Sequence, residues 1–315
     1  MKDTISYYTD VKEICDRLAF PADAKEEFLN IEKRLAETPQ FFSELAEQVD
    51  RLCKERVSIH NILPEIKGIA EKYGIHFFTL NFIFVMHCSV YTREKYAEEG
   101  LPDSLFWDGL ADLKYKLSEC RNVKGINGTF TEGWYEGFLR LGRFTLGRFQ
   151  FEPFGLYEGE DKKLECGYVL KKGTRFVIIH IPGSGVPLTD EVRSCSYKMA
   201  YDYFKEWVGN ETVLLNTYSW LLYPRAAEFL PESSNIVKFM KDFDIYEWSE
   251  SEQFFDAWRV FGKTAELPPA QWAEDTSLQR AYKKWILNGN KAGAGKGFIV
   301  MHNGENVTHI KDYFG

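Results

Sequence analysis

Apolar residues recur through the first part of the chain at the spacing of amphipathic helices. Within residues 11–18 they fall at i, i+3, i+4 and i+7, and the same spacing returns within residues 42–52. Residues 77–90 are apolar nearly all round, which predicts a buried central helix, with a strand as the alternative. The pattern therefore favours a bundle of helices at the start of the chain.

Helix start and stop signals support this interpretation. Gly74 is a suitable stop for a helix that has Pro64 in its first turn. Asp103 or Ser104 can cap a further helix that runs through Leu117. No alternation typical of strands is found before about residue 140, so this half is predicted to be all-helical.

The pattern changes near Gly142. Residues 144–151 alternate and predict one strand with residues 144, 146, 148 and 150 on the same side. Residues 168–170 and 176–181 predict two more strands joined by a turn at 171–173. Since the second of these strands is apolar throughout, we expect it to be covered on both faces.

A glycine-rich segment then leads into a helix. Pro182-Gly183-Ser184-Gly185 precedes Thr189, a suitable N-cap, and the helix beyond it buries residues spaced from 197 to 208. Residues 213–215 predict the next strand. Strand, loop, helix and strand in this order predict a βαβ unit with parallel strands.

The last part of the chain predicts two helices and a hairpin. Ser233 or Ser234 can cap one helix, residues 278–286 form another, and Asn303-Gly304 between apolar runs is a strong hairpin signal. Residues 289–297 are rich in glycine and predict a flexible loop. They miss the nucleotide-binding Walker motif, because Asn290 and Gly297 stand where that motif needs Gly and Ser/Thr.

Composition and charge limit the classes of function. The 315 residues suffice for two domains of roughly 150 residues each. The net charge of −8 and the lack of a basic cluster argue against nucleic-acid binding, but leave room for a small anionic cofactor. The six cysteines are scattered without zinc or disulfide spacing. With no apolar signal core and no membrane-length apolar run, we expect a cytoplasmic protein without a membrane partner.

Several segments together resemble a bacterial family described as acyltransferase domain-containing proteins. Its members join a helical N-terminal acyltransferase-associated domain to a GNAT-like C-terminal domain. The resemblance covers most of the chain and is carried by residues 100–106, 134–137, 142–144, 147–151, 180–188, 196–200, 219–224 and 230–239.

The resemblance implies both a fold and an activity. The fold is α+β overall, with an all-α N-terminal domain over residues 1–141 and a GNAT-like α/β domain with a mixed sheet over 142–315. GNAT enzymes move an acyl group from acyl-coenzyme A to an amine, so the expected partners are acyl-coenzyme A and a small-molecule or amine acceptor. The alternatives are a non-catalytic binding or regulatory protein on a degenerate GNAT-like fold, and a hydrolase or other enzyme with an unrelated site.

Amine acylation needs a base for the amine proton and an acid for the leaving thiolate. His180 ends a predicted core strand, where α/β sheets place ligands, and Glu152 is a second candidate base. Tyr218 is a candidate acid, and Ser219 could donate to the acyl carbonyl oxygen. Each has a structural alternative: a rim histidine, a solvated glutamate, a packed or surface tyrosine and a turn cap.

Cofactor and substrate contacts are predicted nearby. GNAT proteins hold a diphosphate on a turn of the form Gln/Arg-x-x-Gly-x-Gly/Ala, and this chain has His in the first place followed by Gly183, Ser184 and Gly185. A plain strand-to-helix turn is the alternative. Trp220 and Asn235 are candidate substrate contacts, with packing and helix capping as alternatives. The histidines lack close carboxylate partners in the sequence, so no metal site is predicted.

Overall fold

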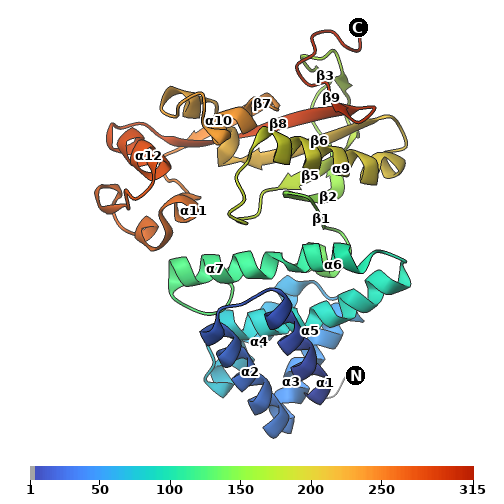
Figure 1. Ribbon diagram of the computed structural model, residues 1–315, viewed down its shortest axis with the longest axis vertical. Helices are drawn as coiled ribbons and strands as arrows, with labels where there is room; N and C mark the ends of the chain where they lie inside the picture. Colours follow the sequence, from blue (N-terminus) through green and yellow to red (C-terminus); the bar gives the residue numbers. More distant parts are fainter. Residues whose placement is uncertain (1–3) are drawn as a thin grey trace. The chain divides into compact units, whose positions relative to one another are not determined.

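The computed structural model describes residues 4–315, and the chain divides into two compact units, Met1–Phe144 and Thr145–Gly315. The first is helical and the second is built on a mixed sheet (Figure 1). The predicted α+β class, with an all-helical part first and an α/β part with a mixed sheet second, is therefore confirmed. Each unit is described below by itself.

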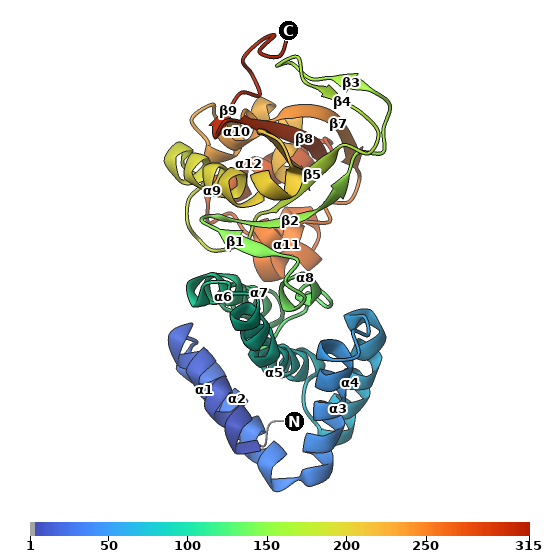
Figure 2. The same ribbon diagram turned by 90° about the vertical axis from the view of Figure 1, so that its right-hand side faces the viewer.

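The first unit is a set of helices around one buried helix. In Figure 2, α1 and α2 form one antiparallel pair and α3 and α4 another, and both pairs lie against α5. Helix α5 is buried over most of its length, so the predicted central helix is confirmed and the strand alternative is wrong. The helices are α1 (Thr4–Arg17), α2 (Ala22–Glu37), α3 (Pro39–Cys53), α4 (Ile59–Tyr73), α5 (Phe77–Glu98), α6 (Asp103–Leu110), α7 (Asp112–Lys124) and α8 (Glu136–Leu139).

Two helix limits in this unit differ from the expectation. Gly74 ends α4 in the left-handed region as predicted, but the helix starts at Ile59, so Pro64 lies inside it and not in its first turn. The helix expected to run through Leu117 is divided into α6 and α7, and Pro102 takes the N-cap position. Buried apolar residues continue along both, which is why one apolar stripe suggested a single helix.

The second unit is a curled sheet in the order β1-β2-β5-β6-β8-β7, with β9 paired to β8 and a separate hairpin β3-β4. Its strands are β1 (Phe144–Leu146), β2 (Phe149–Leu156), β3 (Lys162–Lys163), β4 (Val169–Leu170), β5 (Arg175–His180), β6 (Thr212–Ser219), β7 (Asp244–Ser251), β8 (Ala292–His302) and β9 (Glu305–Asn306). Its α-helices are α9 (Asp190–Val208), α10 (Asn235–Met240), α11 (Ala257–Phe261) and α12 (Ser277–Leu287).

The centre of the sheet is the predicted βαβ unit. Strand β5 leads through the glycine-rich loop into α9, and β6 returns parallel to β5. Thr189 caps α9 as predicted. Helix α9 covers one face of the sheet, where Phe149 stacks on Tyr197 and Phe151 lies against Phe204. The topology thus brings the end of β5, the loop and the end of β6 to one edge.

The alternating run at residues 144–151 is two strands and not one. Gly147 and Arg148 form a two-residue turn between β1 and β2, and Gly147 has φ +69°. Only glycine takes this left-handed conformation without strain. Because a two-residue turn preserves the alternation of the flanking strands, the sequence pattern alone did not reveal it.

The glycine-rich run before the last hairpin is also a strand, so the expected flexible loop is wrong. Strand β8 starts at Ala292 and pairs with both β6 and β7. A Cβ atom on Gly295 would lie 2.2 Å from the carbonyl oxygen of Leu222, and one on Gly293 would lie 2.3 Å from the Tyr223 ring. The glycines therefore permit close packing. The expected hairpin at Asn303-Gly304 is present between β8 and β9.

Among the described residues, no single helix is long and apolar enough to cross a membrane; one sharply bent pair, α4 with α5, reaches that length and apolar character together.

Candidate active site

The parallel strands β5 and β6 stop pairing through their backbones before either strand ends. Val177 lies opposite Leu215 and Ile178 opposite Asn216, but no such pair follows. One residue further on, the Thr217 hydroxyl donates to the Ile179 carbonyl at 2.9 Å, so a side chain takes the place of a backbone donor. The two strand ends thus part at the carboxyl edge of the sheet, where ligands of α/β proteins bind.

His180 and Glu152 form a side-chain pair at this edge. His180 Nε2 lies 2.8 Å from Glu152 Oε2, and the side chains are 22% and 17% exposed. Strands β2 and β5 are antiparallel with Gln150 opposite His180, so Glu152 is the diagonal neighbour of His180 on the same face. A carboxylate in this position orients an imidazole and stabilises its protonated form.

Tyr218 belongs to the same face as this pair. Since Ile178 lies opposite Asn216, the two-residue periodicity of strands puts His180 and Tyr218 on one side. Tyr218 is 62% exposed, and the Lys296 ammonium lies 5.9 Å from its ring centroid. Lys296 in turn donates to Glu247 at 2.9 Å, which raises the pKa of the lysine.

Ser219, Trp220 and Asn235 have other surroundings. Ser219 follows Tyr218 and so points to the opposite face, where its hydroxyl accepts from the Leu221 amide at 3.1 Å and caps a short 3-10 helix. Trp220 packs against Phe254 and Tyr282. Asn235 is exposed at the first position of α10, which Ser234 caps. His180 and Glu152 are thus in contact and Tyr218 lies on the same face of the sheet, whereas Ser219 points to the opposite face, Trp220 belongs to an aromatic cluster and Asn235 begins α10.

The loop between β5 and α9 offers exposed backbone amides. The Ser184 amide donates to the Pro182 carbonyl at 2.9 Å, and the Ser184 hydroxyl accepts from Val186 at 3.3 Å. Within the described part of the chain, the amides of Gly183 and Gly185 donate to no protein acceptor, and both glycines are exposed. Gly185 has φ +75° with open space around its Cβ position. Such amides suit an anion.

Arg148 is a residue of this site that the sequence did not single out. Its guanidinium donates from Nη1 to the Pro182 carbonyl and from Nε to the Val186 carbonyl, both at 2.9 Å. It therefore bridges the two ends of the glycine-rich loop. The alternating pattern put Arg148 within a strand; the Gly-Arg pair was the available signal that it lies in a turn.

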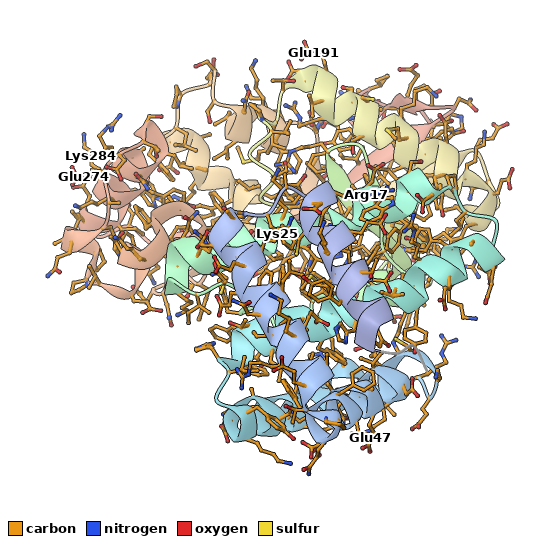
Figure 3. The ribbon with its side chains drawn as sticks, turned by 60° about the horizontal axis from the view of Figure 1, so that its bottom comes forward. Arg17, Lys25, Glu47, Glu191, Glu274 and Lys284 are labelled. Atoms are coloured by element: carbon orange, nitrogen blue, oxygen red, sulfur yellow. The ribbon has the colours of Figure 1, made fainter. Side chains whose placement is uncertain are left out.

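The start of α9 is fixed by its own side chains. Glu191 lies at the N-terminal end of α9 (Figure 3), where its backbone amide and the Thr189 hydroxyl lower its pKa. Arg193 is buried and donates to the Leu188 carbonyl at 2.6 Å and to Asp242 through two nitrogens at 2.6 and 3.1 Å. The helix that follows the loop is thus held against the segment after α10.

Among residues 4–315, no three His, Cys, Asp or Glu side chains are grouped as a metal site.

Two protein-family models match the chain in sequence. A model described as the N-acyltransferase N-terminal domain matches residues 9–141, and one described as the GNAT-like C-terminal domain matches residues 143–299. The second model contains the His180–Glu152 pair, Arg148 and the glycine-rich loop. No curated protein matches the chain.

Solved acyltransferase structures share the fold. One, in complex with decanoyl-CoA and teicoplanin, is 21% identical with a TM-score of 0.70, and the match covers 92% of this chain and 87% of that one. Another, with CoA and 10C-teicoplanin, is 21% identical with a TM-score of 0.71 over the same shares. A mutant acyltransferase with octanoyl-CoA is 20% identical, with a TM-score of 0.70 over 93% of this chain and 88% of that one.

The helical unit, the sheet with its parted parallel strands and the two family matches agree with one another. The chain belongs to the proteins that join an N-acyltransferase N-terminal domain to a GNAT-like C-terminal domain.

Proposed function

We propose that this protein is a cytoplasmic acyltransferase that transfers an acyl group from acyl-coenzyme A to an amine. The observation that carries the proposal is the loop after β5, whose Gly183 and Gly185 amides have no protein acceptor among the described residues. The loop lies between the parted strand ends and α9, the place where a diphosphate and the arm attached to it could be held together.

The residues present fit coenzyme A. Gly183, Ser184 and Gly185 would hold its phosphates, and the missing backbone pairs beyond Ile178 leave strand ends that can bond an extended amide-containing arm. The cofactor supplies an acyl carbonyl activated as a thioester. Everything else in the reaction falls to side chains of this chain and to the acceptor.

His180 is the proposed base. The amine nitrogen of the acceptor bonds to the acyl carbonyl carbon as the carbon–sulfur bond breaks, and the amine proton passes to His180. Glu152, 2.8 Å away, orients the imidazole and stabilises its positive charge. Tyr218 is the proposed acid that protonates the departing sulfur, and solvent restores both groups to their starting forms. Atoms and charges then balance.

The remaining candidates have weaker support. Ser219 points to the face of the sheet opposite His180, where its hydroxyl oxygen accepts from the Leu221 amide, so its O–H would have to reach the acyl oxygen from the other face. Trp220 and Asn235 remain proposed substrate contacts, Trp220 from the aromatic cluster beyond β6 and Asn235 from the exposed start of α10. We therefore rank the His180, Glu152 and Tyr218 group first.

For the donor and the acceptor, the solved relatives suggest where to start. Those acyltransferases were crystallised with decanoyl-CoA, CoA or octanoyl-CoA, and two of them also with a form of teicoplanin. We propose a medium-chain acyl-CoA as donor. The proposed acceptor is a primary amine, on a small molecule or on a larger glycopeptide.

Binding and turnover are tested separately. Thermal unfolding of the full chain is followed with acetyl-, octanoyl- and decanoyl-CoA, and a donor present at about 100 times its Kd should stabilise the protein by roughly 2.7 kcal/mol. Turnover is followed by chromatography of the acylated amine in a panel of amines. Thiol reagents are unsuitable, because Cys195 is exposed and would react as well.

One observation favours the non-catalytic alternative. Asp190 and Glu191 bring two carboxylates to the start of α9, and Pro182 and Pro187 remove two amides from the loop. If acyl-CoA binds but no amine is acylated, the protein is a binding or regulatory member of the fold. If no CoA thioester shifts the unfolding temperature at millimolar concentration, the proposed function is wrong and the non-catalytic alternative is favoured.

A further inference from the structure

The two hydrogen bonds of Arg148 fix the orientation of peptide groups in the glycine-rich loop. Arg148 reaches from the β1–β2 turn to the carbonyl of Pro182 on one side of the loop and to that of Val186 on the other, each at 2.9 Å. The three residues proposed to hold phosphates lie between these two anchors. The loop is therefore fixed at both ends by one side chain.

The geometry of the peptide bond determines in which direction the loop amides then point. In a trans peptide, the carbonyl and the N–H of the same unit point in opposite directions, and the described backbone contains no cis peptide. The Pro182 carbonyl and the Gly183 N–H belong to one such unit. When Arg148 draws that carbonyl toward itself, the Gly183 N–H must point away from Arg148.

The second hydrogen bond, from Arg148 to the Val186 carbonyl, involves a peptide unit that has no N–H. The Val186 carbonyl shares its peptide unit with Pro187, which has no N–H to offer. This bond therefore fixes the chain without using a donor that an anion could use. With both bonds formed, the donors that the loop can offer to an anion are the Gly183 and Gly185 amides. These amides donate to no acceptor among the described residues.

The base of Arg148 is itself held in place by α9. The Ser196 hydroxyl donates to the Leu146 carbonyl at 2.5 Å and accepts from the Phe149 amide at 3.2 Å, so both ends of the turn bond to one side chain. A Cβ atom on Gly147 would lie 3.3 Å from Ser196. The turn, the loop and the start of α9 thus form one connected support.

We propose that Arg148 is the positioning residue of a diphosphate-binding loop: it orients the peptide groups around Gly183–Gly185 so that their amides receive the phosphates, and its charge favours the anion. The inference rests on the proposed function and adds a residue to it. A lysine cannot replace it, because one ammonium on a flexible stem does not reproduce the fixed fork that bonds two carbonyls.

The test compares two donors that share the thioester and differ in the diphosphate. Arg148→Ala and Arg148→Lys are assayed with octanoyl-CoA and with S-octanoyl-pantetheine, which has no phosphate. We expect KM for octanoyl-CoA to rise roughly tenfold to a hundredfold, as for the loss of one or two charge-assisted hydrogen bonds, and kcat/KM for the pantetheine thioester to change much less. Arg175→Ala is the matched control, since Arg175 is an exposed arginine at the opposite end of β5.

The outcomes separate the two proposals. If the wild-type protein uses neither donor and binds no CoA, the proposed function fails, and the role of Arg148 with it. If the wild type uses octanoyl-CoA and both variants keep its KM, the role of Arg148 is refuted while the function stands. Equal losses with both donors would also refute it, because they would show a general structural role.

Discussion

The hydroxyl of Thr217 on β6 donates to the carbonyl of Ile179 on β5 at the point where the two parallel strands stop pairing. Both residues are buried, so neither group has water as a ready substitute. The bond satisfies a carbonyl that the neighbouring backbone no longer reaches. It lets the strands part without leaving a buried acceptor unpaired.

Thr217→Val keeps the shape of the side chain and removes the donor. We expect the unfolding free energy to fall by about 1 to 3 kcal/mol, the cost of a buried unpaired carbonyl, and the Tm to fall by a few degrees, roughly 2–4 °C per kcal/mol. Thr217→Ser keeps the hydroxyl and should retain most of the stability. Equal unfolding temperatures for the valine variant and the wild type would contradict the role of this bond.

Replacement of His180 should remove catalysis without unfolding the protein. His180→Gln is expected to lower kcat by about 10²- to 10⁴-fold, the usual contribution of a general base. Glu152→Gln keeps a hydrogen bond but loses the charge, so the loss should be smaller.

Rates are measured at saturating acyl-CoA, and Glu158→Gln, an exposed carboxylate in the same unit, is the control. A His180 variant with wild-type kcat would eliminate His180 as the base and leave the CoA-binding part of the proposal to be judged by its own assay.

The pair formed by the buried Arg193 and the partly buried Asp242 should be important for stability. Arg193 is 4% exposed, and Asp242 accepts from it twice and from the Tyr197 hydroxyl at 2.9 Å. Asp242→Ala would leave the buried guanidinium with only the Leu188 carbonyl and the exposed Asp190 carboxylate at 3.0 Å, at a cost of about 3 kcal/mol, the lower end for a broken buried pair. Urea unfolding measures the loss. Asp202→Ala, which breaks an exposed pair with Lys198, should change stability by less than about 1 kcal/mol.

The sequence predicted the architecture because its strongest signals are local and periodic. The apolar faces of α5 and α9, the caps at Gly74 and Thr189, and the Asn303-Gly304 turn depend on residues close together in the chain. The order strand, loop, helix, strand then fixed a parallel pair by a general rule of handedness and connection.

Other features depend on contacts between distant residues and were missed. Arg148 matters because it reaches residues 182 and 186, which no local pattern encodes. The Glu152–His180 contact depends on strand register, so both residues were candidates but their pairing was not foreseen. The glycines of β8 resembled a loop by composition, but they are needed there because Leu222 and Tyr223 approach the strand too closely for a side chain.

The close approach of Leu222 to β8 predicts that a side chain at Gly295 destabilises the protein. A methyl group there would lie 2.2 Å from the Leu222 carbonyl oxygen, which is backbone and cannot rotate away. Gly295→Ala should therefore destabilise the protein by about 1 to 3 kcal/mol through overpacking. Gly68→Ala is the opposite case, since Gly68 lies within α4 with nothing within 4 Å of its Cβ position.

Gly68→Ala should stabilise the protein by roughly 0.5 to 1 kcal/mol, because alanine favours the helix more than glycine does. Thermal unfolding of the two variants side by side compares them, and a Gly295→Ala variant as stable as the wild type would show that β8 tolerates a side chain at this position.

In the helical unit, the buried contact between Glu32 of α2 and His87 of α5 should show strong energetic coupling. Glu32 Oε1 lies 2.8 Å from His87 Nε2, and the side chains are 2% and 1% exposed. Tyr7 stacks on the imidazole at 4.1 Å, which leaves water little access from that side. Loss of either side chain leaves the other buried without a hydrogen-bond partner and without access to water.

His87→Leu should therefore cost about 3 to 5 kcal/mol, whereas the double variant Glu32→Leu/His87→Leu should lose less than the sum of the single variants, because replacing both members removes the unpaired group. A double-mutant cycle from urea unfolding gives the coupling. Additive losses would mean that the two side chains stabilise the helices independently, by packing alone, and that the hydrogen bond between them contributes nothing to holding α2 against α5.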